Sequence, residues 1–219
     1  MRLFLAFFLL SALAVAEPSP TLIGGTPAPA GEWPASVYAS MNGARCTATV
    51  VGPRVLAIAA HCVSNGGTAS FTVDGKRYSS TCTHSSDYRG NSTADYSLCL
   101  INQEVTGIEY DSLLQDASKM KVGMTVKLTG YGCVRPGGGG GNDGIYRIGN
   151  AKVTRLPSGN NNDVVTNANP GALCFGDSGG PAVMTDDEGK RWVFGVNSRG
   201  DIASVSYLSA WYTAQAKRS

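Results

Sequence analysis

Short apolar runs separated by turn residues are the feature that most limits the folds open to this chain. Glycine, asparagine, aspartate or proline bounds most of them, and such short runs between turn signals are typical of all-β sandwiches and barrels. The chain has 219 residues, of which 42% are hydrophobic. That is enough for one globular unit with a sizeable core. The runs span residues 37–39, 47–51, 55–60, 97–101, 124–129, 182–184, 192–196 and 204–208.

The first 16 residues have the pattern of an export signal. Arg2 supplies a positive end, Leu3 to Leu10 is an unbroken apolar run, and Ala14-Val15-Ala16 is a small-x-small cleavage site. A membrane anchor is the alternative. However, Leu3 to Ala16 is 14 residues long, whereas a spanning helix needs about 20. We therefore expect residues 1–16 to be a cleaved signal peptide, and the mature protein to be secreted and free of the membrane.

The cysteines fit an exported protein. The chain has six, and an even count behind a signal peptide predicts three disulfides without fixing how they pair. A metal site is a weak alternative, because the sequence has no Cys-x-x-Cys pair and no histidine cluster. We expect neither a metal nor another cofactor. The six are Cys46, Cys62, Cys82, Cys99, Cys133 and Cys174.

Three further features place weaker limits on function. A net charge of +2 without a long block of like charge predicts no nucleic-acid partner. Residues 136–144 contain five consecutive glycines, a composition typical of a mobile surface loop. Asn91-Ser92-Thr93 is a glycosylation sequon, which matters only in a host that glycosylates secreted proteins.

A serine flanked by glycines carries the clearest chemical signal. It lies in Gly176-Asp177-Ser178-Gly179-Gly180-Pro181, far downstream of a histidine in Ala59-Ala60-His61-Cys62. A serine hydroxyl is a poor nucleophile at neutral pH and needs a positioned base. The glycines let the backbone approach a substrate closely. We therefore predict that Ser178 is a nucleophile and that His61 is its base.

The order of these residues along the chain separates two families of hydrolase. Gly-x-Ser-x-Gly also fits the nucleophile elbow of α/β-hydrolases, in which the acid and then the histidine follow the serine. Here the two histidines, His61 and His84, both precede Ser178. The order that remains is His, Asp, Ser, the order of the chymotrypsin-like fold. We expect His84 to lie in a polar surface loop.

Together the motifs resemble those of trypsin- and chymotrypsin-like serine endopeptidases, from about Leu22 to about Tyr207. The resemblance rests on the serine motif and on Ala57-Ile58-Ala59-Ala60-His61-Cys62, Asp95-Tyr96-Ser97-Leu98-Cys99-Leu100-Ile101 and Leu22-Ile23-Gly24-Gly25. It implies an all-β fold of two six-stranded antiparallel barrels, at about 22–104 and 122–208, with the site between them. Residues 105–121 would connect the barrels, and Ser209 to Lys217 would form a short C-terminal helix.

The resemblance also assigns roles to the site residues. Ser178 would be the nucleophile of an acyl-enzyme reaction, His61 the general base and then the acid, and Asp95 the group that orients the imidazole. Asp87 competes for the last role, but it lies in a turn and leads into no apolar strand. The backbone N–H groups of Gly176 and Ser178 would form the oxyanion hole.

A precursor form is implied as well. Residues 17–21 would be a short propeptide, and residues 22–219 the protease domain. Cleavage after Thr21 would free the amine of Leu22, which would pair with the carboxylate of Asp177.

The substrate pocket and the disulfides are also assigned by resemblance. The pocket floor would be Ala172, which cannot bind a basic side chain, so we expect an uncharged residue before the scissile bond. Ser198 would pair with the substrate backbone, and Gly200 would leave the pocket mouth open. The neighbouring Arg199 stands where the family usually has an aromatic residue. The implied bridges are Cys46–Cys62, Cys82–Cys99 and Cys133–Cys174.

These features together predict a secreted serine endopeptidase that acts on proteins or peptides as a monomer. Two other classes remain open. A protease-like binding protein would share the fold, although such proteins usually lose a member of the triad. An esterase would share Gly-x-Ser-x-Gly, but the chain order argues against it.

Overall fold

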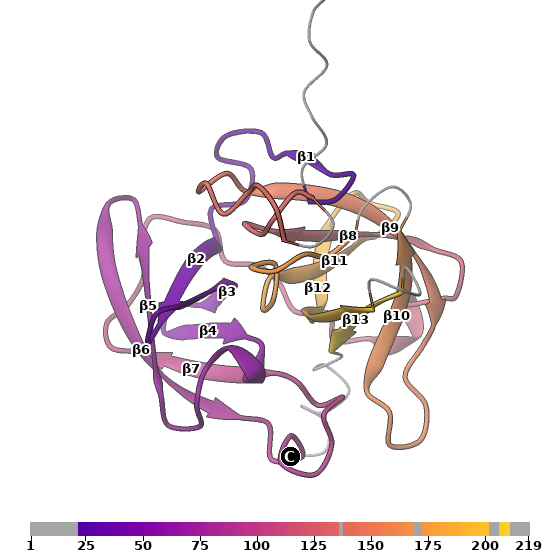
Figure 1. Cartoon of the computed structure of the whole chain (residues 1–219), viewed down its shortest axis with the longest axis horizontal. Helices are drawn as coiled ribbons and strands as arrows, with labels where there is room; N and C mark the ends of the chain where they lie inside the picture. Colours follow the sequence, from indigo (N-terminus) through magenta and orange to yellow (C-terminus); the bar gives the residue numbers. More distant parts are fainter. Residues whose placement is uncertain (1–21, 136–137, 169–171, 202–205, 211–219) are drawn as a thin grey trace, which may run out of the picture.

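The structure is a computed structural model that describes residues 22–135, 138–168, 172–201 and 206–210. Within these ranges the fold is built from β-strands, and the helical elements are two short 3-10 turns. Figure 1 shows strands β2 to β7 gathered in one lobe and strands β8 to β13 in a second lobe beside it. The prediction of an all-β fold is confirmed.

The first lobe is a closed antiparallel barrel. Its strand order is β2-β3-β4-β7-β6-β5, and its centre is filled by buried side chains such as Val50, Leu56, Ile58, Phe71 and Ile101. The strands are β2 (Ser36–Met41), β3 (Ala44–Gly52), β4 (Val55–Ile58), β5 (Thr68–Val73), β6 (Lys76–His84) and β7 (Ser97–Ile101).

The second lobe is a seven-stranded antiparallel sheet. Its order is β1-β9-β10-β13-β12-β11-β8, and β9 also pairs with β8. Its core includes Val126, Leu128, Val153, Val164 and Phe194. The strands are β1 (Thr26–Pro27), β8 (Thr125–Gly130), β9 (Arg147–Arg155), β10 (Asp163–Ala168), β11 (Pro181–Thr185), β12 (Arg191–Asp201) and β13 (Ser206–Ala210).

The chain crosses between the lobes through an irregular segment after β7. This segment carries the short 3-10 turn η2 (Ala117–Lys119) and is anchored by Val105 and Leu114, which are almost completely buried. The side chain of Val105 packs in the first core, whereas that of Leu114 packs in the second. The segment between β7 and β8 therefore contacts the cores of both lobes.

Apolar runs located some strands and missed others. Strands β2, β3, β4, β7, β8, β11, β12 and β13 fall on predicted runs. Strands β5, β6, β9 and β10 were missed, because buried and exposed residues alternate along β6 and β9 and many of the buried ones are small or polar, such as Ser80 and Gly149. The predicted helix from Ser209 is wrong at its start, since Ser209 and Ala210 belong to β13 and pair with residues of β10 and β12. Residues 211–217 lie outside the described residues.

Three disulfides tie the fold together, as predicted. Cys46–Cys62 joins β3 to the 3-10 turn η1 (Ala60–Cys62), and Cys82–Cys99 joins directly opposed residues of β6 and β7. Cys133–Cys174 joins the loop after β8 to the segment before Ser178. Such bridges are typical of proteins folded in an oxidising compartment.

The predicted signal peptide, residues 1–16, and propeptide, residues 17–21, lie outside the described residues. Among the residues that are described, no helix has the length and apolar character needed to cross a membrane.

Candidate active site

His61 is presented by a short turn at the end of an apolar strand. Strand β4 and the following Ala59 and Ala60 are buried almost throughout, so the chain is held in the barrel up to the residue before His61. The disulfide from Cys62 to β3 anchors the other side of the turn. His61 itself keeps 38% of its side chain exposed. The imidazole is thus fixed at its base and open to a substrate.

Asp95 binds His61 at two points. Its Oδ1 accepts the main-chain N–H of His61 at 2.8 Å, and its Oδ2 lies 2.6 Å from the ring Nδ1. Asp95 is fully buried, and its Oδ2 also accepts the hydroxyl of Ser198 at 2.5 Å. Burial would raise the pKa of Asp95, but the bonds from His61 and Ser198 outweigh it and hold that pKa below its usual value. An ionised Asp95 favours a proton on Nδ1 and leaves Nε2 of His61 free to act as a base.

Ser178 lies in a loop held from both lobes. Its carbonyl accepts the N–H of Thr47 from the first barrel at 2.9 Å, and the N–H of Gly179 donates to Asn197 of β12 at 2.7 Å. Gly179 has a φ of +81°, and a Cβ there would collide with the carbonyl oxygen of Thr47. Glycine is therefore required next to the serine because two backbones meet at this point.

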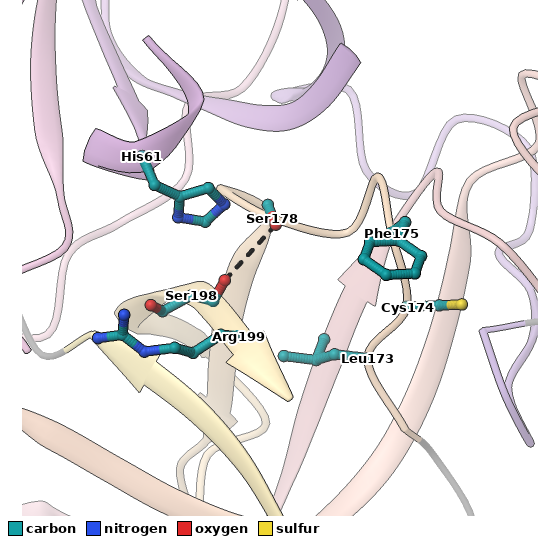
Figure 2. Close-up of a pocket in the computed structure, with 7 residues that line it drawn as sticks. All are labelled: His61, Leu173, Cys174, Phe175, Ser178, Ser198 and Arg199. Atoms are coloured by element: carbon teal, nitrogen blue, oxygen red, sulfur yellow. Dashed lines mark hydrogen bonds between the residues drawn. The ribbon is translucent and has the colours of Figure 1, made fainter. Parts of the chain in front are cut away.

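His61 and Ser178 line one cavity of about 330 Å³. Figure 2 shows the imidazole of His61 facing Ser178 at one end, with Leu173 and Phe175 at the other. The hydroxyl of Ser178 lies 3.5 Å from the carbonyl of Ser198, and the described residues show no hydrogen bond between Ser178 and His61. The full lining is His61, Leu173, Cys174, Phe175, Ser178, Ser198 and Arg199.

The residues predicted for the substrate pocket lie in different environments. Ala172 is 2% exposed and packs in the second core, and its N–H donates to the carbonyl of Ile23 at 2.8 Å. Ser198 lines the cavity, as does Arg199, whose guanidinium donates to the carbonyl of Ser92. Gly200 pairs with Tyr207 across β12 and β13. No carboxylate lines this cavity among the described residues.

The backbone before Ser178 has an unusual shape. Gly176 has a φ of +100°, a region that side chains disfavour. Its carbonyl accepts the hydroxyl of Thr47 at 2.8 Å. In the part of the chain that the structure describes, the N–H groups of Gly176 and Ser178 have no acceptor. The loop that carries Ser178 thus has two backbone donors without partners among the described residues.

Asp177 is buried, and its carboxylate is bound by backbone N–H groups. It accepts the N–H of Gly132 and that of Cys174, each at 2.8 Å. Burial raises the pKa of Asp177 to about 7 in spite of these two bonds. A Cβ at Gly130 or Gly132 would collide with Asp177, so both glycines make room for it. Among the described residues Asp177 forms no ion pair.

Leu22 is fully buried in the second core. In this chain it follows Thr21 through a peptide bond and therefore has no free amine. The predicted pair between Leu22 and Asp177 is accordingly not formed in the uncleaved chain.

Sequence reasoning missed several residues of this site. Thr47 binds the serine loop from the other lobe, and Leu173 and Phe175 line the cavity. Phe175 is 65% exposed although it is a large aromatic residue. No spacing or motif marks Thr47, which lies inside an ordinary apolar run. In the described ranges, no group of three or more histidine, cysteine or acidic residues is placed to hold a metal.

Comparison with known proteins places this architecture in a family. Residues 22–214 match the family model of trypsin. The chain belongs to the trypsin family. Among solved structures it is similar to a mutant of human heparin binding protein, with a TM-score of 0.72 and 20% identity over 90% of this chain and 94% of the other. At that identity the likeness shows the fold alone. No curated protein matches this member of the trypsin family in sequence.

Proposed function

We propose that this trypsin-family protein is a secreted serine endopeptidase with His61, Asp95 and Ser178 as its catalytic triad. The observation that carries the proposal is the double attachment of His61 to Asp95, with the imidazole facing Ser178 across one cavity. A base held by a buried acid and pointed at a serine is the arrangement that activates a hydroxyl for acyl transfer.

The reaction follows from these positions. Ser178 Oγ attacks the carbonyl carbon of a peptide bond while Nε2 of His61 takes its proton. The carbonyl oxygen becomes negative and accepts the N–H groups of Gly176 and Ser178. The C–N bond then breaks as His61 passes its proton to the leaving amine, which leaves an acyl group on Ser178. Water activated by His61 attacks this ester and frees the acid.

The cavity favours an uncharged residue before the scissile bond. Leu173 and Phe175 provide apolar surface, and no described lining residue carries a negative charge. A lysine or arginine side chain would lose its hydration there without gaining a counter-ion. The buried Ala172, next to Leu173, supplies no charge either.

The state of Asp177 supports synthesis as an inactive precursor. The buried carboxylate of Asp177, with a pKa raised to about 7, forms no ion pair among the described residues, and a buried charge is stabilised by a partner of opposite sign. Removal of residues 1–21 would create such a partner at Leu22. The apolar N-terminus and the three disulfides support export.

The second barrel and the monomeric state of the enzyme belong to the same proposal. We interpret the second sheet as the second barrel of the family, because β8 pairs with both β9 and β11. We also expect the mature enzyme to act as a monomer on protein or peptide substrates, since the cavity is complete within one chain.

Peptide hydrolysis by processed protein tests the proposal. Protein that begins at Leu22 should cleave a denatured protein substrate, and the Ser178→Ala variant prepared in the same way should not. The alternative is a binding protein on the same fold, the property named for the similar human protein. That alternative predicts no hydrolysis by either preparation.

A further inference from the structure

Thr47 connects the first barrel to the serine loop of the second lobe. It lies on β3 (Ala44–Gly52) and is fully buried despite its hydroxyl. Its N–H donates to the carbonyl of Ser178 at 2.9 Å. Its Oγ1 donates to the carbonyl of Gly176 at 2.8 Å and accepts the N–H of Tyr131 at 3.0 Å. One residue thus holds two carbonyls of the serine loop and one N–H of the segment beside it.

Along the chain, the carbonyl of Gly176 lies between the two proposed oxyanion donors, and the carbonyl of Ser178 directly follows the second. The dihedral angles on either side of the peptide that joins Gly176 to Asp177 therefore set the directions of both donors. Gly176 has no side chain to restrict its dihedral angles and adopts a φ of +100°. Two contacts therefore keep the peptide after Gly176 in a single orientation: its N–H, that of Asp177, donates to the carbonyl of Cys174 at 3.0 Å, and its carbonyl accepts the hydroxyl of Thr47.

The same hydroxyl also binds the segment that surrounds Asp177. Tyr131 lies between Gly130 and Gly132, and the N–H of Gly132 donates to the carboxylate of Asp177. Oγ1 thus uses its one donor and one of its two acceptor lone pairs. A side chain of the same shape without the oxygen would leave a carbonyl and an N–H without partners in a buried place, which is costly.

We propose that the hydroxyl of Thr47 is a positioning group for the oxyanion donors and the nucleophile. It is fully buried and acts through the peptide that joins Gly176 to Asp177. This role rests on the proposed peptidase function, and it predicts a specific defect. Loss of the hydroxyl should weaken stabilisation of the transition state while leaving substrate binding almost unchanged.

The test uses enzyme beginning at Leu22 with Thr47→Val, Thr47→Ser and a matched control, Thr49→Val. Thr49 is equally buried on the same strand, but its hydroxyl donates to Asp111 at 2.7 Å. The measurements are kcat and KM for a peptide amide, and the affinity of a peptide aldehyde, which forms a tetrahedral adduct on the serine. Thermal unfolding of each variant separates damage to the fold from damage to the site.

Thr47→Val should lower kcat about 10- to 100-fold with little change in KM, somewhat less than the loss of a whole oxyanion donor. The aldehyde should bind more weakly by a similar factor. Thr47→Ser should restore most of both losses, and Thr49→Val should stay near the parent enzyme in both. If Thr47→Val does not fold, Thr47→Ala removes the same hydroxyl without placing a methyl group against the carbonyl.

Three results would overturn the role of Thr47. They are a change in KM alone for Thr47→Val, an equal loss of kcat in Thr49→Val, or a loss in Thr47→Ser as large as that in Thr47→Val. If the parent enzyme and Thr47→Val both hydrolyse peptide normally, only the role proposed for Thr47 is contradicted. A parent enzyme that neither hydrolyses peptide nor binds the aldehyde contradicts the proposed function, and the role of Thr47 falls with it.

Discussion

The carboxylate of Asp95 binds His61 twice, through the ring Nδ1 at 2.6 Å and through the main-chain N–H at 2.8 Å. The second contact fixes the acid to the backbone that carries the histidine, so the ring and its partner keep one geometry. The hydroxyl of Ser198 adds a third bond to the same carboxylate. The base of the proposed reaction is therefore oriented before any substrate arrives.

Replacement of the nucleophile or the base should abolish hydrolysis. We expect Ser178→Ala and His61→Ala each to lower kcat by a factor of about a million, and the double variant to be no worse than either alone, because the residues act as a unit. Steady-state kinetics on the three variants decide this. Ample activity in purified Ser178→Ala would remove the assignment of the nucleophile.

The processed enzyme should cleave after uncharged residues such as phenylalanine, leucine or alanine. The reason is that Leu173 and Phe175 line the cavity, and Ala172 offers no charge to a basic side chain. A peptide library in which only the residue before the scissile bond varies gives the measurement. A profile dominated by arginine or lysine would show that an acid reaches the pocket from another part of the chain.

Active protein should begin at Leu22. The five residues of the expected propeptide, 17–21, contain no arginine or lysine, so a protease without trypsin-like specificity must make the cut. The new amine can then pair with Asp177, and Asp177→Asn should remain largely inactive even when correctly cleaved. N-terminal sequencing and kinetics on this variant test the two parts. Full activity in protein that still begins at Glu17 would contradict the precursor model and leave the triad intact.

The uncleaved chain should lose stability as the pH rises from about 4 to 7. Burial raises the pKa of Asp177 to about 7 in the folded chain, so between these pH values the native state binds a proton that the unfolded state has lost. The free energy of unfolding then falls by up to about 1.4 kcal/mol per pH unit. Denaturant unfolding of the uncleaved chain and of its Asp177→Asn variant, at pH 4.5 and 7.5, isolates this contribution. Equal pH dependence in the two proteins would show that Asp177 does not titrate in this range.

Motifs with a fixed residue pattern were predictable from the sequence. His61 and Ser178 stand out by their neighbours, and the structure places them around one cavity with the buried Asp95 bound to His61. The apolar runs located strands such as β3 and β7 because those strands carry continuous or regularly spaced aliphatic residues. The disulfide pairs followed from the family pattern together with the number of cysteines.

Contacts between distant segments were not predictable. Thr47 and Gly176 lie 129 positions apart, and nothing local to Thr47 indicates that its hydroxyl binds a loop of the other lobe. Strand β9 was missed for a different reason: its inward positions include Gly149 and Ala151, whose small side chains produce no apolar run. The predicted helix from Ser209 is wrong at its start because Ser209 and Ala210 belong to β13 and pair with both β10 and β12.

Covalent labelling by a fluorophosphonate tests the central claim most directly, since the probe reacts with a serine that an adjacent base has activated. Protein beginning at Leu22 should take up one equivalent, and peptide mass spectrometry should place the phosphonyl group on Ser178. His61→Ala and the uncleaved chain should react far more slowly. Correctly folded, processed protein that takes up no probe, or that carries it on another residue, would contradict the assignment of this chain as a serine peptidase.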